Sequence, residues 1–296
     1  MSTPKILLQF DSDPLPSSFD AVVAIDCGID HLLPYGNVTA ENAIGLVHGA
    51  MFTRGPNKLN YTALFIGGSN VQTGEHIAKA VKQAFFGPIR VSVMLDGNGS
   101  NTTASAAVLC AARHSALPDI DALILGATGP VGYRAAMLIA ASGGTVRLAS
   151  RDCARAENVR DRLLQEVPEA TSEKLHVLSS SDAEQTNHHL DQCTAVFGCG
   201  AAGVELLSDN QLRGSSSLKL AIDLNAVPPA GLAPIAVTDK AVDRDGRVDY
   251  GALGVGGLKM QIHKECVRRL FSANDLFLDS REIFAIGQEL EASRAK

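Results

Sequence analysis

One stretch constrains the fold more than any other part of the chain, because an apolar run, a glycine-rich turn and a helix start follow one another without a break. It reads Leu123-Ile124-Leu125-Gly126-Ala127-Thr128-Gly129-Pro130-Val131-Gly132, and its glycine spacing is a variant of the dinucleotide-binding fingerprint. There the first glycine permits the sharp turn, the second lets backbone approach a pyrophosphate, and the third lets the helix pack closely. Amides at the helix start then hold the phosphates. The stretch predicts a Rossmann-type domain with cofactor contacts at Gly126, Thr128, Gly129, Pro130 and Val131; a purely structural glycine turn is the alternative.

The residues after the next expected strand indicate which dinucleotide binds. NAD sites commonly place Asp or Glu there, to accept hydrogen bonds from the adenine ribose. This chain has Ser150-Arg151 instead, and an arginine forms a two-pronged, charge-assisted pair with a 2'-phosphate. The pattern favours NADP, with NAD as a weaker substitute. The alternative is that Arg151 is simply solvated and that NAD is also accepted, because Asp152 lies close by.

Two later segments are expected beside the same cofactor. Doubly wound sheets bind ligands beyond the carboxyl ends of their strands, where we place residues 198–201 and 225–229. Glycine lets the backbone lie near the ribose or nicotinamide, and an asparagine can offer its amide. The candidates are Gly200, Ala201 and Asn225. Ordinary loop geometry explains each of them about as well.

Short β-like runs alternate with helical patterns along nearly the whole chain, which is typical of an α/β protein. Strands are expected at 5–10, 21–26, 61–67, 89–95, 122–125, 145–149, 175–178, 194–197 and 218–223, and helices at 40–49, 74–86, 104–115, 131–141, 154–166, 258–271 and from 279. The charged, turn-like residues 239–249 predict an exposed loop, and the turn formers at 96–103 mark a domain junction. We expect an α/β substrate domain, 1–103, completed by C-terminal helices 258–296, and a Rossmann-type NADP-binding domain, 104–257, with a cleft between them.

Composition excludes several classes of function. The formal net charge is -6 and the basic residues are scattered, whereas a nucleic-acid surface needs clustered positive charge. No apolar run reaches the ~18 to 20 residues of a membrane helix, and the N-terminus lacks a signal-peptide pattern, so a cytoplasmic protein without membrane contact is expected. The six cysteines form no CxxC pair, and buried structural thiols are the expectation. His188-His189 lack a ligand set at metal-binding spacing, so no metal site is predicted.

Further segments, spread over nearly the full length, carry a resemblance to a known family. They are Gln9-Phe10-Asp11 with Phe19-Asp20, Tyr35-Gly36-Asn37-Val38-Thr39, Phe85-Phe86-Gly87-Pro88, Met94-Leu95-Asp96 with Asn98-Gly99-Ser100-Asn101-Thr102-Thr103, Glu205-Leu206-Leu207, Asn225 with Pro228-Pro229, and Gly251-Ala252-Leu253-Gly254 with Gly256-Gly257-Leu258-Lys259. With the glycine fingerprint, they make the chain resemble the NADP-dependent methylene-tetrahydromethanopterin dehydrogenases, relatives of the methylene-tetrahydrofolate dehydrogenases. It departs from the family pattern at Ala127-Thr128, at 166–192 and at Asp26-Cys27-Gly28.

The resemblance implies a cytoplasmic homotrimer with an active site in a crevice between the two domains, to which a neighbouring subunit contributes. The family's proposed active-site residues fall on Phe19, Thr103, Lys259 and His263, and its 2'-phosphate arginine falls on Arg151. The implied reaction moves a hydride from methylene-tetrahydromethanopterin, or also methylene-tetrahydrofolate, to NADP and leaves a methenyl cation. No proton moves, so catalysis should come mainly from holding the reactants together and excluding water.

Several of these residues have plainer explanations. Lys259 and His263 are four residues apart on a predicted helix and share one face, which can equally be a solvated face. A protonated lysine beside the forming cation would oppose the reaction. Lys259 should therefore address a carbonyl or carboxylate of the pterin, or carry a lowered pKa. Phe19 can be a core residue and Thr103 a helix cap. Asp96 and Asn98 are expected at the polar edge of the pterin, with turn formation as the alternative. For the whole protein, a non-catalytic NADP-binding sensor or scaffold is the competing hypothesis.

Overall fold

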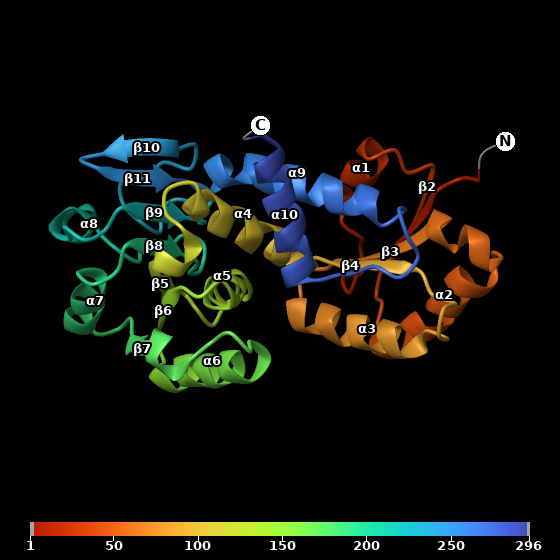
Figure 1. Ribbon diagram of the computed structural model, residues 1–296, viewed down its shortest axis with the longest axis horizontal. Coiled ribbons are helices and arrows are strands. Elements are labelled where there is room, and N and C mark those ends of the chain that lie inside the picture. Colours follow the sequence, from red (N-terminus) through yellow and green to blue (C-terminus); the bar gives the residue numbers. More distant parts are fainter. Residues whose placement is uncertain (1–2, 295–296) are drawn as a thin grey trace. The chain divides into compact units, whose positions relative to one another are not determined.

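The computed structural model describes residues 3–294, so residues 1–2 and 295–296, the outer ends of the expected N-terminal domain, lie outside the described residues. The chain divides into two compact units (Figure 1). Unit 1 takes the residues up to Thr102 and those from Met260 onward, and unit 2 is Thr103–Lys259. Helices α4 (Ser100–Ala112) and α9 (Ala252–Arg269) contribute residues to both units. Because each unit has a largely parallel sheet of its own, the expected two-domain α/β fold is confirmed.

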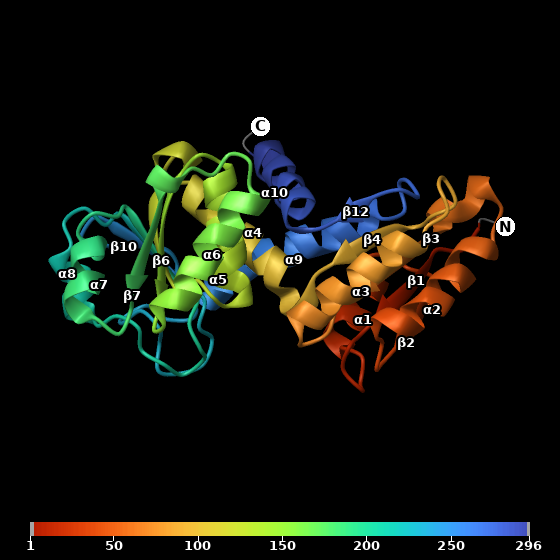
Figure 2. The same ribbon diagram turned by 90° about the horizontal axis from the view of Figure 1, so that it is seen from below.

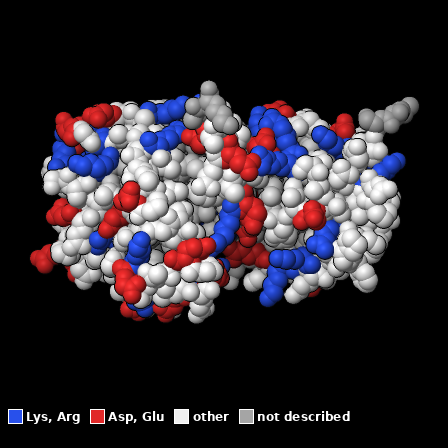
Figure 3. Space-filling model, viewed as in Figure 1, with Lys and Arg blue, Asp and Glu red and all other residues white. Residues whose placement is uncertain are grey.

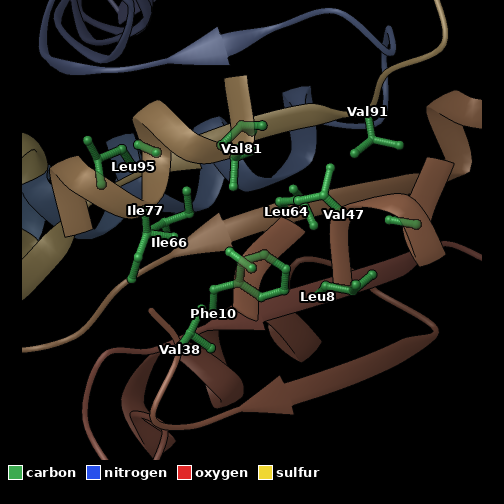
Figure 4. Packing of buried hydrophobic residues seen from close by; sticks show 14 of the residues in the cluster. Leu8, Phe10, Val38, Val47, Leu64, Ile66, Ile77, Val81, Val91 and Leu95 are labelled. Carbon is green, nitrogen blue, oxygen red and sulfur yellow. The ribbon is translucent and has the colours of Figure 1, made fainter. Parts of the chain in front are cut away.

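Unit 1 is a five-stranded parallel sheet in the order β12-β4-β3-β1-β2. Helices α2 and α3 cover one face of the sheet, while α1 and the unit's part of α9 cover the other (Figures 1 and 2). Alternate strand residues such as Leu8, Phe10, Leu64 and Ile66 point toward α2 and α3 and form a buried core (Figure 4). The elements are β1 Ile6–Phe10, α1 Ser18–Asp26, β2 His31–Tyr35, α2 Ala40–Phe52, β3 Thr62–Ile66, α3 Val71–Ala84, β4 Ser92–Leu95, β12 Phe277–Leu278 and α10 Ser280–Arg294, with 3-10 turns at Pro56–Tyr61 and Gly97–Gly99.

Unit 2 is a seven-stranded sheet in the order β10-β11-β9-β8-β5-β6-β7. Every pairing is parallel except that of the edge strand β10 with β11. From β7 to β11 this is the strand order of a doubly wound dinucleotide-binding sheet, and the order reverses between β5 and β8, where such sheets bind ligands. The elements are β5 Asp121–Leu125, α5 Pro130–Ala141, β6 Thr145–Ser150, α6 Cys153–Glu166, β7 Leu175–Ser179, α7 Ala183–Leu190, β8 Ala195–Gly198, α8 Asp209–Gly214, β9 Leu220–Asp223, β10 Lys240–Arg244 and β11 Arg247–Tyr250, with 3-10 turns at Leu117–Asp119 and Ser172–Lys174.

The strand expected at 21–26 is wrong, because this segment lies in helix α1. Ser17 caps the helix by accepting a hydrogen bond from the amide of Asp20, which favours a helix start over a strand. Val23 and Ala24 are buried as neighbours, which is not the alternation of a strand. The edge strand next to β1 is β2, and its Pro34 is tolerated because β2 pairs on one side only.

The exposed loop expected at 239–249 is also wrong, since these residues form the hairpin of β10 and β11. Its turn is Asp245-Gly246, with φ of 57° and 85°, and an Asp-Gly pair is a strong signal for a two-residue hairpin turn. The hairpin is partly buried: Asp249 is fully buried and accepts hydrogen bonds from Arg244 and Arg247.

Helix α9 begins at Ala252, earlier than the expected 258. Gly254 permits close backbone packing rather than a loop, because a Cβ there would lie 1.8 Å from the carbonyl oxygen of Asp239.

The surface carries charges of both signs. On the face shown in Figure 3, Lys and Arg side chains are interspersed with Asp and Glu. Among residues 3–294, no helix is long and apolar enough to cross a membrane, and no cluster of side chains is suited to hold a metal ion.

Candidate functional site

The glycine turn in unit 2 has the geometry of a phosphate cradle. Gly126 has a φ of 82°, and a Cβ there would lie 2.6 Å from the carbonyl oxygen of Cys199. A Cβ on Gly132 would lie 2.4 Å from the carbonyl oxygen of Gly126, so both positions require glycine. The N-cap of α5, Gly129, makes no side-chain cap, and Pro130 follows it. Within the part of the chain that the structure describes, no side chain caps the amides at the start of α5, so an anion can accept from them.

The turn is anchored to the sheet, which fixes the position of these amides. The amides of Gly126 and Ala127 both donate to the carbonyl of Ala149 on β6. Thr128, Gly129 and Val131 are half-buried and Pro130 is exposed, so a ligand can reach this bend. The residues present fit a dinucleotide pyrophosphate.

The end of β6 presents one buried and one exposed side chain. Ser150 is buried, and its hydroxyl accepts from the amide of Asp152. Arg151 is exposed, and within residues 3–294 its guanidinium has no hydrogen-bond or ion-pair partner. The carboxylate of Asp152 caps α6 by accepting from the amide of Ala154. The guanidinium is thus available to a phosphate, while the carboxylate already serves the helix.

The loops after β8 and β9 meet around a carboxylate that the sequence did not single out. Asp223 is buried and accepts from the amides of Asn225, Gly231 and Leu232 at 3.1, 2.7 and 3.1 Å. A Cβ on Gly198 would lie 2.9 Å from Asp223 Oδ1, so a glycine is needed beside it. Burial raises the pKa of this carboxyl, against the lowering effect of its three amide donors.

Two of the cofactor residues expected in these loops, Asn225 and Gly200, contact neighbouring residues of unit 2. The side chain of Asn225 serves its own loop: Nδ2 donates to the carbonyl of Pro229 and Oδ1 accepts from the amide of Val227. Gly200 packs on Leu206, because a Cβ there would lie 2.8 Å from that side chain, and Ala201 is exposed. Cofactor contacts by Gly200, Ala201 and Asn225 stay predictions.

In unit 1, two of the expected site residues, Phe19 and Asp96, lie beside the imidazole of a third, His263. His263 is 2% exposed, its Nδ1 lies 3.3 Å from Asp96 Oδ2, and its ring lies 6.5 Å from that of Phe19, edge to face. Phe65 contacts the same imidazole at 5.5 Å between ring centroids, and Asp20 Oδ1 lies 4.0 Å from Nε2. Phe19 itself is 49% exposed, so it is not a core residue.

Asp96 holds the start of α4. Its Oδ1 accepts from the amides of Asn101 and Thr102, and its Oδ2 accepts from the Thr102 hydroxyl at 2.7 Å. This buried carboxylate is the helix cap, so Thr103, which lies within α4, is not. Direct pterin contact by Asp96 stays a prediction, but its contacts favour a positioning role. Asn98 is exposed in the turn before α4, with a φ of 51°.

Thr103 and Lys259 are the first and last residues of unit 2, on the helices α4 and α9 that continue into unit 1. Both are half-buried. Lys259 lies one helical turn before His263 on α9, so the two side chains point to the same side of that helix.

Comparisons with known proteins identify the family. Residues 18–98 match the family model described as methylene-tetrahydromethanopterin dehydrogenase, N-terminal. The bifunctional protein MdtA of Methylorubrum extorquens AM1 is 40% identical over 290 residues, which cover 97% of this chain and 99% of that protein. The NAD(P)-dependent methylenetetrahydromethanopterin dehydrogenase of the same organism is 30% identical over 283 residues, 93% of this chain and 94% of its own. The chain belongs to this dehydrogenase family.

Similarity to solved structures informs only the fold of this member of the methylene-tetrahydromethanopterin dehydrogenase family. Shikimate 5-dehydrogenase from Listeria monocytogenes has a TM-score of 0.52 at 14% identity, with 97% of this chain and 96% of that chain covered. The 5-ketofructose reductase of Gluconobacter sp. strain CHM43 has a TM-score of 0.51 at 13% identity, with coverage of 97% and 99%. Both are Rossmann-type dehydrogenases, in agreement with the strand order of unit 2.

Proposed function

We propose that the protein is an NADP-dependent methylene-tetrahydromethanopterin dehydrogenase of one-carbon metabolism. The full-length similarity to an NAD(P)-dependent methylenetetrahydromethanopterin dehydrogenase carries this proposal. It is supported by a glycine cradle with open helix amides in unit 2 and by an aromatic and charged cluster in unit 1. Unit 2 then binds the cofactor, and unit 1 binds the pterin.

NADP, rather than NAD, is the proposed cofactor. The exposed guanidinium of Arg151 can pair with the 2'-phosphate, and Asp152 serves as a helix cap. Gly126, Thr128, Gly129, Pro130 and Val131 would hold the pyrophosphate, and Ser150 would lie at the ribose. Bound NADP supplies the hydride acceptor. NAD is a weaker substitute.

The chain's own part in the reaction is to orient the pterin and keep water away. Phe19 offers an exposed ring for packing on the substrate, and His263 lies beside that ring. Asn98 would offer its side-chain amide to the polar edge of the pterin. Thr103 offers a hydroxyl. Lys259 addresses an oxygen of the pterin rather than the reacting carbon, because a like charge there would oppose formation of the cation. No residue needs to accept a proton.

The broader features of the family are part of the same proposal. By resemblance, the enzyme is a cytoplasmic homotrimer, and methylene-tetrahydrofolate is a second substrate. Sedimentation of the purified protein measures the subunit number, and kinetics with each pterin measure the preference.

The deciding experiment follows the absorbance of reduced nicotinamide with purified protein, NADP and each methylene pterin. We expect turnover with methylene-tetrahydromethanopterin and weaker turnover when NAD replaces NADP. Tight NADP binding without turnover on either pterin would instead favour a cofactor-binding sensor or scaffold. The same assay without pterin is the control for background reduction.

A further inference from the structure

Three carboxylates gather at the carboxyl edge of the unit 1 sheet. Strands β1, β3 and β4 pair in register, so the residues that follow them, Asp11, Gly67 and Asp96, lie side by side. The third carboxylate, Asp20, comes from the first turn of α1. A Cβ on Gly67 would lie 3.5 Å from Asp20 Oδ2 and 3.0 Å from Phe65 Cε1. The glycine therefore keeps the space before Asp20 open.

Two of these carboxylates are enclosed by the protein and the third is accessible. Asp11 is 1% exposed and accepts from the amides of Asp13 and Ser17. Asp96 is 2% exposed and holds the start of α4. The side chain of Asp20 is 18% exposed, and its Oδ1 lies 4.0 Å from Nε2 of His263. Of the three, Asp20 is the one that a ligand can reach.

One of the buried polar atoms without a hydrogen-bond partner near this edge belongs to the imidazole beside Asp20, which points to a polar ligand there. Within residues 3–294, Gln9 Oε1, Ser12 Oγ and His263 Nδ1 are buried and have no hydrogen-bond partner. The Nδ1 atom lies near Asp96, at 3.3 Å, but without hydrogen-bond geometry. Gln9 is next to Phe65 in the strand register, and Ser12 Oγ lies 2.3 Å from the position of a Cβ on Gly68. Such atoms are uncommon in folded proteins and need a partner.

We propose that Asp20 faces the methylene bridge of the bound pterin and stabilises the positive charge that forms there. This inference rests on the proposed function. When the reaction runs, one C–H bond of the bridge breaks, both electrons leave with the hydrogen to NADP, and the pterin keeps one positive charge shared by two nitrogens. NADP is reduced, the bridge is oxidised, and no proton is released. A carboxylate at this position favours the product side of that step and the transition state that leads to it.

His263 and Asp96 complete the arrangement. The imidazole lies between Asp20 and Asp96, with Phe65 against its ring. Asp96 is enclosed, holds the start of α4 and lies beside the imidazole, whereas Asp20 acts on the ligand.

The test compares the affinities of Asp20→Asn for the cationic methenyl pterin and the neutral methylene pterin, each measured by equilibrium titration without NADP. We expect methenyl affinity to fall by about tenfold or more, because a charge pair in a partly shielded site is lost, while methylene affinity changes by less than about twofold. The rate of hydride removal should fall with the methenyl affinity. Asp20→Glu, which keeps the charge, should recover part of both.

The matched control is Asp26→Asn on the same helix. Asp26 pairs with Lys264 at the surface, so its loss changes the net charge equally and should leave both affinities unchanged. Equal losses for the two pterins in Asp20→Asn would mean that the carboxylate recognises the pterin ring and not the charge, and unchanged affinities would mean that it does not face the ligand; either result overturns the inference. The proposed function is tested separately: it fails if the wild-type protein does not turn over either methylene pterin.

Discussion

At the scale of single residues, Arg151 is the clearest determinant of cofactor choice. Its guanidinium is exposed and has no partner within residues 3–294, so it can pair with a 2'-phosphate at no cost to the fold. We expect Arg151→Ala to raise the KM for NADP by about tenfold to a hundredfold, since charge-assisted hydrogen bonds are worth about 1.5–3 kcal/mol. The KM for NAD should change by less than about threefold. Arg155→Ala, one turn along α6, is the control, and equal effects on NADP and NAD would contradict the assignment.

Asp223 gives a prediction about pH. Burial raises its pKa in the folded protein above the ordinary value of an aspartate. The folded state then binds this proton more tightly than the unfolded state does. The resulting stabilisation of the folded protein is complete below the unfolded-state pKa and is lost as the pH rises through the folded-state pKa. Asp223→Asn lacks this titration. Urea unfolding should show wild type gaining stability relative to Asp223→Asn as the pH falls from about 7 to about 4. A constant difference would mean that the amide donors balance burial, and a difference of opposite sign would mean that they outweigh it.

The contrast between these two residues explains what sequence can reveal about a site. Arg151 could be predicted because the end of the second strand has a known role in dinucleotide binding. Asp223 could not, because its importance comes from amides of residues 231 and 232 that approach it only in the folded loop. Asp20 is visible in the sequence only as part of a family pattern, because its nearness to His263 depends on the packing of α1 and α9 on one sheet.

At the scale of elements, the packing of α5 on the glycine turn is the most sensitive contact. A Cβ on Gly132 would lie 2.4 Å from one backbone atom and 3.0 Å from another, and backbone cannot move aside as a flexible side chain can. We expect Gly132→Ala to lower the free energy of unfolding by about 1–3 kcal/mol and to weaken NADP binding. The control is Gly45→Ala on the exposed face of α2, where nothing lies within 4 Å of the added Cβ. It should stabilise by about 0.5–1 kcal/mol; urea titrations of both variants measure the difference, and a neutral Gly132→Ala would show that the turn can yield.

Most helices and strands could be predicted from their apolar periodicity, and the exceptions have local causes. The segment 21–26 is rich in β-branched residues, but the cap at Ser17 and the burial of adjacent side chains make it helical. The hairpin of β10 and β11 was hidden by its charge, because Arg244, Arg247 and Asp249 form ion pairs that no hydrophobic pattern reports. Its Asp245-Gly246 turn was the signal available.

At the scale of the whole molecule, each unit has a cluster of buried residues of its own. One cluster of buried residues belongs to the unit 1 sheet and helices α2 and α3, and another lies in unit 2 around β5, β8 and β9. The division into two α/β units follows from the alternation of elements along the chain. Helices that take part in both units, α4 and α9, are less predictable, because their sequences show no break where the units meet.

This division predicts how bound cofactor alters backbone exchange across the molecule. A ligand stabilises the segments whose opening would release it, so NADP should slow amide hydrogen exchange at residues 126–133 and in the loops after β8 and β9. Exchange in α2 and α3 should stay within about twofold of the free protein, because their amides are protected by the core of unit 1. Mass spectrometry of peptides from both units, with Arg151→Ala as a weak-binding control, measures this. If protection appeared in α2 and α3 but not at 126–133, the cofactor would bind in unit 1, and the assignment of the two units would have to be reversed.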